Sequence, residues 1–228
     1  MQRVSAGGLT LYVLSVTFFA VDFLMSLTPH WFSAIYGVYV LGGQVLSGMA
    51  FAILVALFLS ERPPMNGAFQ HIHFHDYGKL LLAFTMLWSY FGISQFIIIW
   101  SGDLPEEIPF FKDRLSGVWG AVSLLLVLFH FAVPFFLLLS RSLKRDIRKL
   151  SLVALLLHVM RWVDNWWLVA PAFPAHGFPL HWLDLAAPVA IGGIWVWLFT
   201  GQIVKAPLLP VHDANLTAAL EAEAHAHG

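Results

Sequence analysis

The stretch "LSLVALLLHVMRWVDNWWLVAPAF", residues 150–173, shows most directly what kind of fold to expect. It is long enough to cross the hydrocarbon core of a bilayer, which takes about 17–25 residues of α-helix. Its interior nevertheless carries four polar side chains, His158, Arg161, Asp164 and Asn165. Because residues three or four apart share one face of a helix, these side chains should lie together. A charge at mid-bilayer is costly unless it is paired or hydrated, so that face is expected inside a helix bundle.

The composition of the chain indicates that water is not its main solvent. Of the 228 residues, 59% are hydrophobic and only 11% are charged, whereas a soluble domain carries roughly a quarter charged residues. The formal net charge of -1 gives no reason to expect nucleic acid. The chain has no cysteine, which excludes disulfides, thiolate-bound iron–sulfur clusters and c-type haem attachment on it.

Apolar stretches of spanning length recur along the chain. We expect them near residues 9–27, 35–60, 79–100, 117–140, 150–170 and 184–204. The sequence therefore predicts an all-α fold, a polytopic membrane bundle of about six transmembrane helices over residues 1–204. The remaining segment, residues 205–228, is polar and rich in alanine, so we expect a disordered cytoplasmic tail.

The distribution of basic residues predicts the orientation in the membrane. With six crossings, nine Lys and Arg residues fall on one side of the membrane. Only Lys112 and Arg114 fall on the other side. Because cytoplasmic loops carry an excess of Lys and Arg, both termini are predicted to be cytoplasmic.

Other spans offer polar side chains at depths that match those of residues 158–165. Counting about 1.5 Å of rise per residue, we predict one buried polar cluster made of Asp22, Gln44, Gln95, His130, His158, Arg161, Asp164 and Asn165. One interpretation is structural: Arg161 pairs with Asp164 or Asp22 and fixes the helix register. The other is functional: the cluster carries protons or holds a quinone head group. No catalytic residue is predicted.

Two stretches outside the spans invite a local interpretation. In "HIHFHD", residues 71–76, a β-strand would place His71, His73 and His75 on one face, as some metal sites require. A solvated cytoplasmic loop is the favoured interpretation of this stretch. The outer stretch "LPEEIP" is typical of a short helix that begins at Pro105.

Three longer stretches carry a resemblance to a known family. They read "VDFLMSLTPHWFSAIYGVYVLGGQ" (21–44), "FHDYGKLLLAFTMLWSYFGISQFIIIWSGDLPEEIPFF" (74–111) and "HVMRWVDNWWLVAPAF" (158–173). They closely resemble the second of the two membrane subunits of bacterial alternative complex III, a quinol:electron acceptor oxidoreductase of respiratory electron transport. This membrane subunit is related to the polysulfide reductase anchor family. The resemblance covers nearly all of residues 4–205.

The resemblance implies a multi-pass subunit of the bacterial inner membrane that has no redox cofactor and performs no catalysis alone. The implied partners are a paralogous quinol-binding membrane subunit, an iron–sulfur subunit and multihaem cytochrome c subunits, which would carry the iron–sulfur clusters and haem c. The implied role is assembly and proton translocation, with Asp22, His158, Arg161 and Asp164 as the buried polar residues. Family members have about ten spans, so this chain resembles their C-terminal part.

A b-type cytochrome subunit is the alternative interpretation. His130 and His158 are expected at similar depth on different helices and could be the two axial ligands of a haem, with Arg161 paired to a propionate. A transporter with a midplane site would predict inverted repeats, and the sequence does not divide into two convincing halves.

Overall fold

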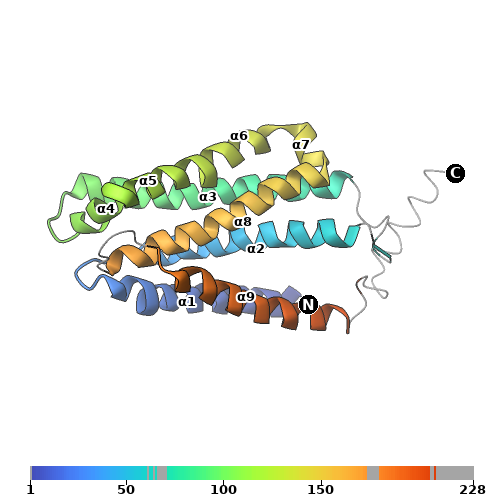
Figure 1. Ribbon diagram of the computed structural model, residues 1–228, viewed down its shortest axis with the longest axis horizontal. Helices are drawn as coiled ribbons and strands as arrows, with labels where there is room; N and C mark the ends of the chain where they lie inside the picture. The colour runs from blue at the N-terminus through green and yellow to red at the C-terminus, as the bar shows by residue number, and fades with distance from the viewer. Residues whose placement is uncertain are drawn as a thin grey trace. The chain divides into compact units, whose positions relative to one another are not determined.

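The computed structural model describes residues 2–60, 62–63, 65, 71–173, 180–205 and 208 (Figure 1). Every regular element within these residues is a helix, which confirms the predicted all-α class. Six of the described helical segments are long and apolar enough to cross a membrane: Val4–Leu27, Tyr36–Ser60, Ile72–Gly102, Gly117–Leu139, Ile147–Ala172 and Trp182–Ile203. They confirm the predicted number of spans and make the chain a multi-pass membrane protein. The predicted tail, 205–228, lies almost entirely outside the described residues.

Five of the six spans belong to one compact unit, which covers residues up to Phe58 and Gln70–Pro179. Its elements are α1 (Gln2–Phe19), the π-helix η1 (Ala20–Leu24), the 3₁₀ turn η2 (Met25–Leu27), α2 (Tyr36–Ser60), α3 (His71–Gly102), α4 (Ile108–Leu115), α5 (Gly117–Leu125), the π-helix η3 (Leu126–Ala132), α6 (Val133–Leu139), α7 (Arg141–Arg145), α8 (Ile147–Val169) and the 3₁₀ turn η4 (Ala170–Ala172). The helix α8 packs against α3, α5, η3 and α6, and α3 also packs against α6 and α7.

Much of the interior of this unit is apolar and is joined by close helix contacts. Its fully buried side chains include Leu46, Ile53, Leu81, Leu138, Leu150 and Leu157. The approach of α1 to α2 depends on Gly37, because a Cβ there would lie only 3.2 Å from the Thr17 Cα. Small residues at such points allow transmembrane helices to pack tightly.

The second unit contains the sixth span, α9 (Trp182–Ile203), together with residues 59–69. Two hydrogen bonds cap the N-terminus of α9. The His181 backbone N–H donates to Asp184 Oδ2 at 2.9 Å, and the Leu183 N–H donates to His181 Nδ1 at 3.3 Å. Such a reciprocal cap satisfies backbone groups that the helix itself leaves unpaired.

The fourth span is not a regular α-helix. Pro134 has no N–H to donate to the carbonyl of His130, four residues earlier, and its ring would clash with that carbonyl in a regular helix. The chain widens instead into η3, and the Val133 N–H donates to the Leu128 carbonyl, five residues back. The widened segment carries His130.

The structure corrects the interpretation of residues 71–79 as a strand or loop. The helix α3 begins at His71, so alternate residues do not share a face. Asp76 forms an ion pair with Lys79 at 2.9 Å, one turn later. Among the described residues no group of three or more His, Cys, Asp or Glu side chains could hold a metal ion. Residues 71–76 are therefore neither the favoured loop nor the strand on which that metal site depended.

The connections on either side of the fourth span contain helices. The outer helix does not start at Pro105. A turn covers residues 105–107, and α4 begins at Ile108 with Pro109 in its first turn. The basic stretch 141–149 forms α7 and the first turn of α8, with Asp146 as the N-cap between them.

Candidate functional site

The candidate site is built on one face of α8, near the middle of the fifth span. Arg161 is 4% exposed and Asp164 is fully buried. Arg161 Nη1 donates to Asp164 Oδ2 one turn along the helix, so the predicted ion pair with Asp164 is confirmed. Pairing within one helix lets both charges be buried without a cation or anion from another span.

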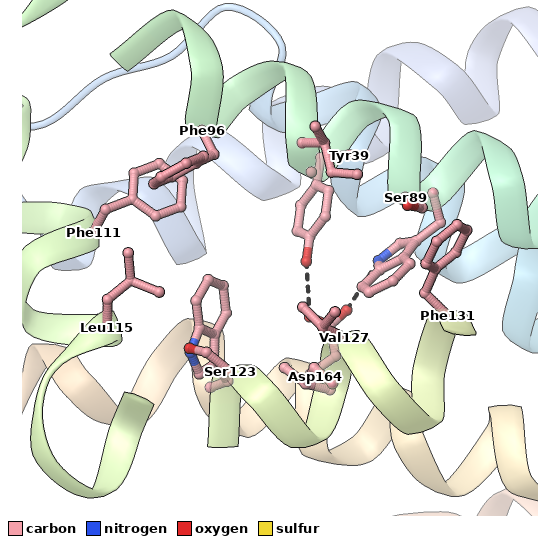
Figure 2. Close-up of a pocket in the computed structure, with 14 residues that line it drawn as sticks. Tyr39, Ser89, Phe96, Phe111, Leu115, Ser123, Val127, Phe131 and Asp164 are labelled. Carbon is pink, nitrogen blue, oxygen red and sulfur yellow. Dashed lines mark hydrogen bonds between the residues drawn. The ribbon is translucent and has the colours of Figure 1, made fainter. Parts of the chain in front are cut away.

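Two other helices complete the surroundings of the Asp164 carboxylate. The Tyr39 hydroxyl of α2 donates to Oδ1 at 2.7 Å, and Trp88 Nε1 of α3 donates to Oδ2 at 3.2 Å (Figure 2). Hydrogen bonds to an ionised acceptor are among the strong ones, particularly away from water. We refer to Tyr39, Trp88, Arg161 and Asp164 as the Arg161 cluster; it ties three spans to one buried carboxylate.

The guanidinium of Arg161 fits against α2 because that helix has no side chain at the point of contact. Arg161 Nη2 donates to the Val40 carbonyl at 3.4 Å. A Cβ at Gly43 would overlap the guanidinium carbon and nitrogens. An arginine has five N–H groups, and these contacts use only some of them.

Each member of the ion pair borders a cavity. The apolar cavity, of about 300 Å³, is lined by Tyr39, Trp88 and Asp164 and otherwise mainly by large apolar side chains. The polar cavity, of about 250 Å³, is lined by Gln44, Arg161 and Asn165 together with apolar residues of α1, η1, α2 and α8. The apolar cavity thus borders the anion and the polar cavity borders the cation.

Both cavities lie toward the C-terminal half of α8. The α8 residues that line them are Arg161 and residues that follow it in the chain, namely Asp164, Asn165, Trp167, Leu168 and Val169. Toward the N-terminal half of α8, Leu150, Val153, Ala154 and Leu157 are at most 3% exposed. The side chains of Thr85 and Ser151 in this layer donate to carbonyls of their own helices. The described bundle therefore gives the cluster space on one side and a dry apolar layer on the other.

The Asp164 carboxylate thus accepts from three donors on three helices, and one of these donors is a cation. Neither protein-family models nor curated proteins give a match to this chain. The function is therefore inferred from the chemistry of the cluster. In the cluster Asp164 is a buried acid, Arg161 is its countercharge and Tyr39 is a hydroxyl neighbour, and ionisable residues within spans are commonly functional.

The predicted cluster is only partly assembled. Gln44 and Asn165 line the polar cavity beside Arg161, and Gln44 Oε1 also accepts from the Tyr12 hydroxyl at 2.9 Å. Asp22 is exposed within η1, and no hydrogen bond or ion pair of its carboxylate occurs among the described residues. Gln95 is 4% exposed, but its Oε1 has no partner there. The structure thus does not bring Asp22 or Gln95 to Arg161.

The two predicted histidines have different surroundings. The His158 ring lies 3.1 Å from the Ser47 hydroxyl, measured from Nδ1. His130 is fully buried, and neither ring nitrogen has a partner among the described residues. Its ring packs against Trp88 with 4.0 Å between centroids. Through Trp88, His130 is one side chain away from Asp164.

Sequence reasoning missed three contributors to the site. Tyr39 and Trp88 belong to the cluster, and the only available signal was an aromatic side chain with a polar tip, a type that seeks a partner when buried. The third is Arg114 of α4, which was assigned to the outer loop. It is 2% exposed and donates to the Leu168 carbonyl at 2.8 Å and to the Phe110 carbonyl at 3.0 Å. Burial lowers the pKa of its guanidinium to about 10; its charge supports the C-terminal end of α8.

Proposed function

We propose that this chain is a membrane subunit that holds and exchanges a proton at Asp164 of the Arg161 cluster. The observation that carries the proposal is the buried Arg161–Asp164 pair in the middle of a span, with Tyr39 donating to the same carboxylate. Ionisable residues within transmembrane segments commonly mark proton or substrate pathways. The polar cavity beside Arg161 supplies room for the guanidinium to move or for water to approach.

The complex in which this subunit acts is part of the same proposal. The stretches 21–44, 74–111 and 158–173 resemble the second membrane subunit of alternative complex III. The cluster draws on all three, through Tyr39, Trp88 and the pair on α8. The chain then lies in the bacterial inner membrane, both termini in the cytoplasm, and supports assembly and proton translocation during quinol oxidation. In this assignment haem c and iron–sulfur clusters reside on its partners.

Co-purification tests the assignment. The tagged chain is solubilised from its native membrane in mild detergent, and the attached proteins are identified by mass spectrometry. The expected result is a second polytopic membrane subunit, an iron–sulfur subunit and a multihaem cytochrome c. Recovery of the chain alone or as a homodimer would contradict membership of the complex.

The b-type cytochrome is the second candidate, and one observation bears on it. His130 has both ring nitrogens without a described partner, as a haem ligand would in the absence of haem. The surroundings fit poorly, however, because Trp88 packs against that ring, and neither the apolar nor the polar cavity is lined by His130 or His158. A reduced-minus-oxidised absorbance band in the purified chain that disappears in His130→Ala would favour this candidate. We expect no such band.

A further inference from the structure

The apolar cavity is a hollow formed by small side chains on facing helices. Ser89 and Gly92 lie one turn apart on α3, and Ser123 lies opposite them on α5. Large rings surround the space. Figure 2 shows Phe96 and Phe111 with Leu115 at one end of the cavity and Phe131 at the other. The volume of about 300 Å³ is at the lower limit of ligand pockets in general.

Tyr39, Trp88 and Ser123 at the wall of this cavity already use their polar groups within the protein, and Ser89 is the lining side chain with no such hydrogen bond among the described residues. The Tyr39 hydroxyl and Trp88 Nε1 donate to Asp164. The Ser123 hydroxyl donates to the Arg114 carbonyl at 2.7 Å and accepts from Trp167 Nε1 at 2.8 Å. A ligand with many hydrogen-bonding groups would therefore leave them unpaired inside the cavity, which is costly. A hydrocarbon occupant has no such cost.

The cavity opens to the outer surface of the bundle, because some of its lining side chains are exposed there. Among its lining residues, Ile93 is 52% exposed, Val127 is 57% exposed and Leu115 is 50% exposed. Ile93 and Val127 lie within spans, where the medium is lipid hydrocarbon. Phe111 and Leu115 belong to α4, which lies between two spans and thus at the level of the head groups. The same short helix carries Lys112, which is exposed.

We infer that the apolar cavity binds one acyl chain of a phospholipid whose phosphate lies beside Lys112. The acyl chain enters past Ile93 and Val127 and ends against the aromatic rings near Asp164. It fills a hollow that would otherwise lie next to the buried carboxylate, and so keeps that side of the Arg161 cluster free of water. This lipid site is independent of the proton proposal, because it requires no movement of Arg161 and no partner subunit.

A photoactivatable phospholipid with a diazirine in its acyl chain tests the inference. The purified full-length protein is reconstituted in nanodiscs that contain this lipid, irradiated and digested, and labelled residues are mapped by mass spectrometry. The expected result is severalfold more label at Gly92, Phe96 and Phe131 than at Leu124, which is 59% exposed on α5 but does not line the cavity. Equal labelling of the cavity and Leu124 would overturn the inference.

Two matched variants sharpen the test. Val127→Trp places a large ring at the mouth, so it should abolish the excess label and the phospholipid retained per chain in native mass spectrometry. Leu124→Trp adds the same ring at a similarly exposed position on the preceding turn and should leave both signals unchanged. If Val127→Trp retained the excess label, the acyl chain would not enter the apolar cavity past Val127, which would overturn the inference. Lys112→Gln should reduce retention without removing the label; unchanged retention would exclude the phosphate contact.

Discussion

Asp164 receives donors from α2, α3 and its own helix, so each donor contributes to keeping a negative charge in a place without water. Arg161 differs from the other two donors because it brings a full positive charge. Tyr39 and Trp88 can stabilise the carboxylate by hydrogen bonding, but they cannot neutralise it. The residue that supplies the countercharge of Asp164 is therefore Arg161.

Arg161→Leu should leave the buried Asp164 carboxylate without a countercharge. Removing one partner of a buried pair typically costs about 3–5 kcal/mol, so thermal unfolding in detergent should shift strongly to lower temperature. The double variant Arg161→Leu with Asp164→Leu should recover most of that loss, because both charges leave together. A single variant as stable as the wild type would mean that Arg161 faces water or lipid head groups.

Gly43→Ala tests the close contact between the Arg161 guanidinium and α2. The added methyl would overlap the guanidinium, so either the arginine or the helix must shift. Overpacking of this kind typically costs about 1–3 kcal/mol. The control is Gly48→Ala on the same helix, where the methyl meets nothing within 4 Å and stability should hold or rise slightly. Equal melting temperatures for the two variants would contradict the close contact.

At this scale the sequence was informative about pairs within one helix. Arg161 and Asp164 are three residues apart, so their contact follows from helix geometry alone. Tyr39 is 125 residues from Asp164 and Trp88 is 76 residues away, and no local pattern predicts which spans face each other. Asp22 was wrongly grouped with them because matching depth does not fix the direction in which a helix turns its side chains.

The helix α8 begins at a well-defined cap, which matters because this helix carries the ion pair. Asp146 Oδ1 accepts from the Arg148 N–H at 3.0 Å and from the Lys149 N–H at 3.3 Å, and its Oδ2 lies 3.2 Å from Lys149 Nζ. The hydrogen bond from the Lys149 side chain, followed by those from the backbone, lowers the pKa of the Asp146 carboxyl. The start of the span is therefore set by an ionised aspartate.

Asp146→Ala should lower the thermal stability at neutral pH, because two backbone donors lose their acceptor. The pKa of Asp146 is lowered on folding, so its contribution is fully present above the usual aspartate pKa of about 3.9. It is lost as the pH falls through the lowered value. The difference in melting temperature between wild type and Asp146→Ala should therefore shrink at acid pH. A difference independent of pH would exclude the charged cap. Asp146→Asn should retain part of the cap.

Element boundaries were predictable where composition changes and unpredictable where tertiary packing extends a helix. The spans emerged from apolar length, but the start of α3 at His71 did not, because "HIHFHD" alternates polar and apolar residues like a strand. Pro134 lacks the N–H that a regular helix needs at that position. Its consequence, a π-helix that carries His130, depends on how the surrounding helices hold the span together.

For the molecule as a whole, composition and apolar periodicity were sufficient to predict an all-α membrane bundle with six spans. They could not show that five spans form one unit while α9 belongs to another. The buried surface of a membrane helix is as apolar as its lipid-facing surface, so hydropathy does not mark the packed face. The cavities beside Arg161 were unpredictable for the same reason.

The orientation of the bundle can be tested directly because the chain contains no cysteine. Lys112→Cys on α4 and Ser142→Cys on α7 introduce single thiols in segments at opposite ends of the fourth span. A membrane-impermeant maleimide should label Lys112→Cys in intact spheroplasts, and should label Ser142→Cys only after the membrane is opened. The reverse pattern would place both termini outside and overturn the orientation predicted from the basic residues.

Proton release during quinol oxidation by the assembled complex tests the central claim, that Asp164 holds and exchanges a proton with Arg161 as its countercharge. The variant to measure is Arg161→Leu with Asp164→Leu, in which the buried charges leave together and assembly should survive. We predict that quinol turnover is retained while proton release per turnover falls well below that of the wild type. Near-normal turnover with near-normal proton release would show that the pair only holds the helices in register, and would contradict the claim.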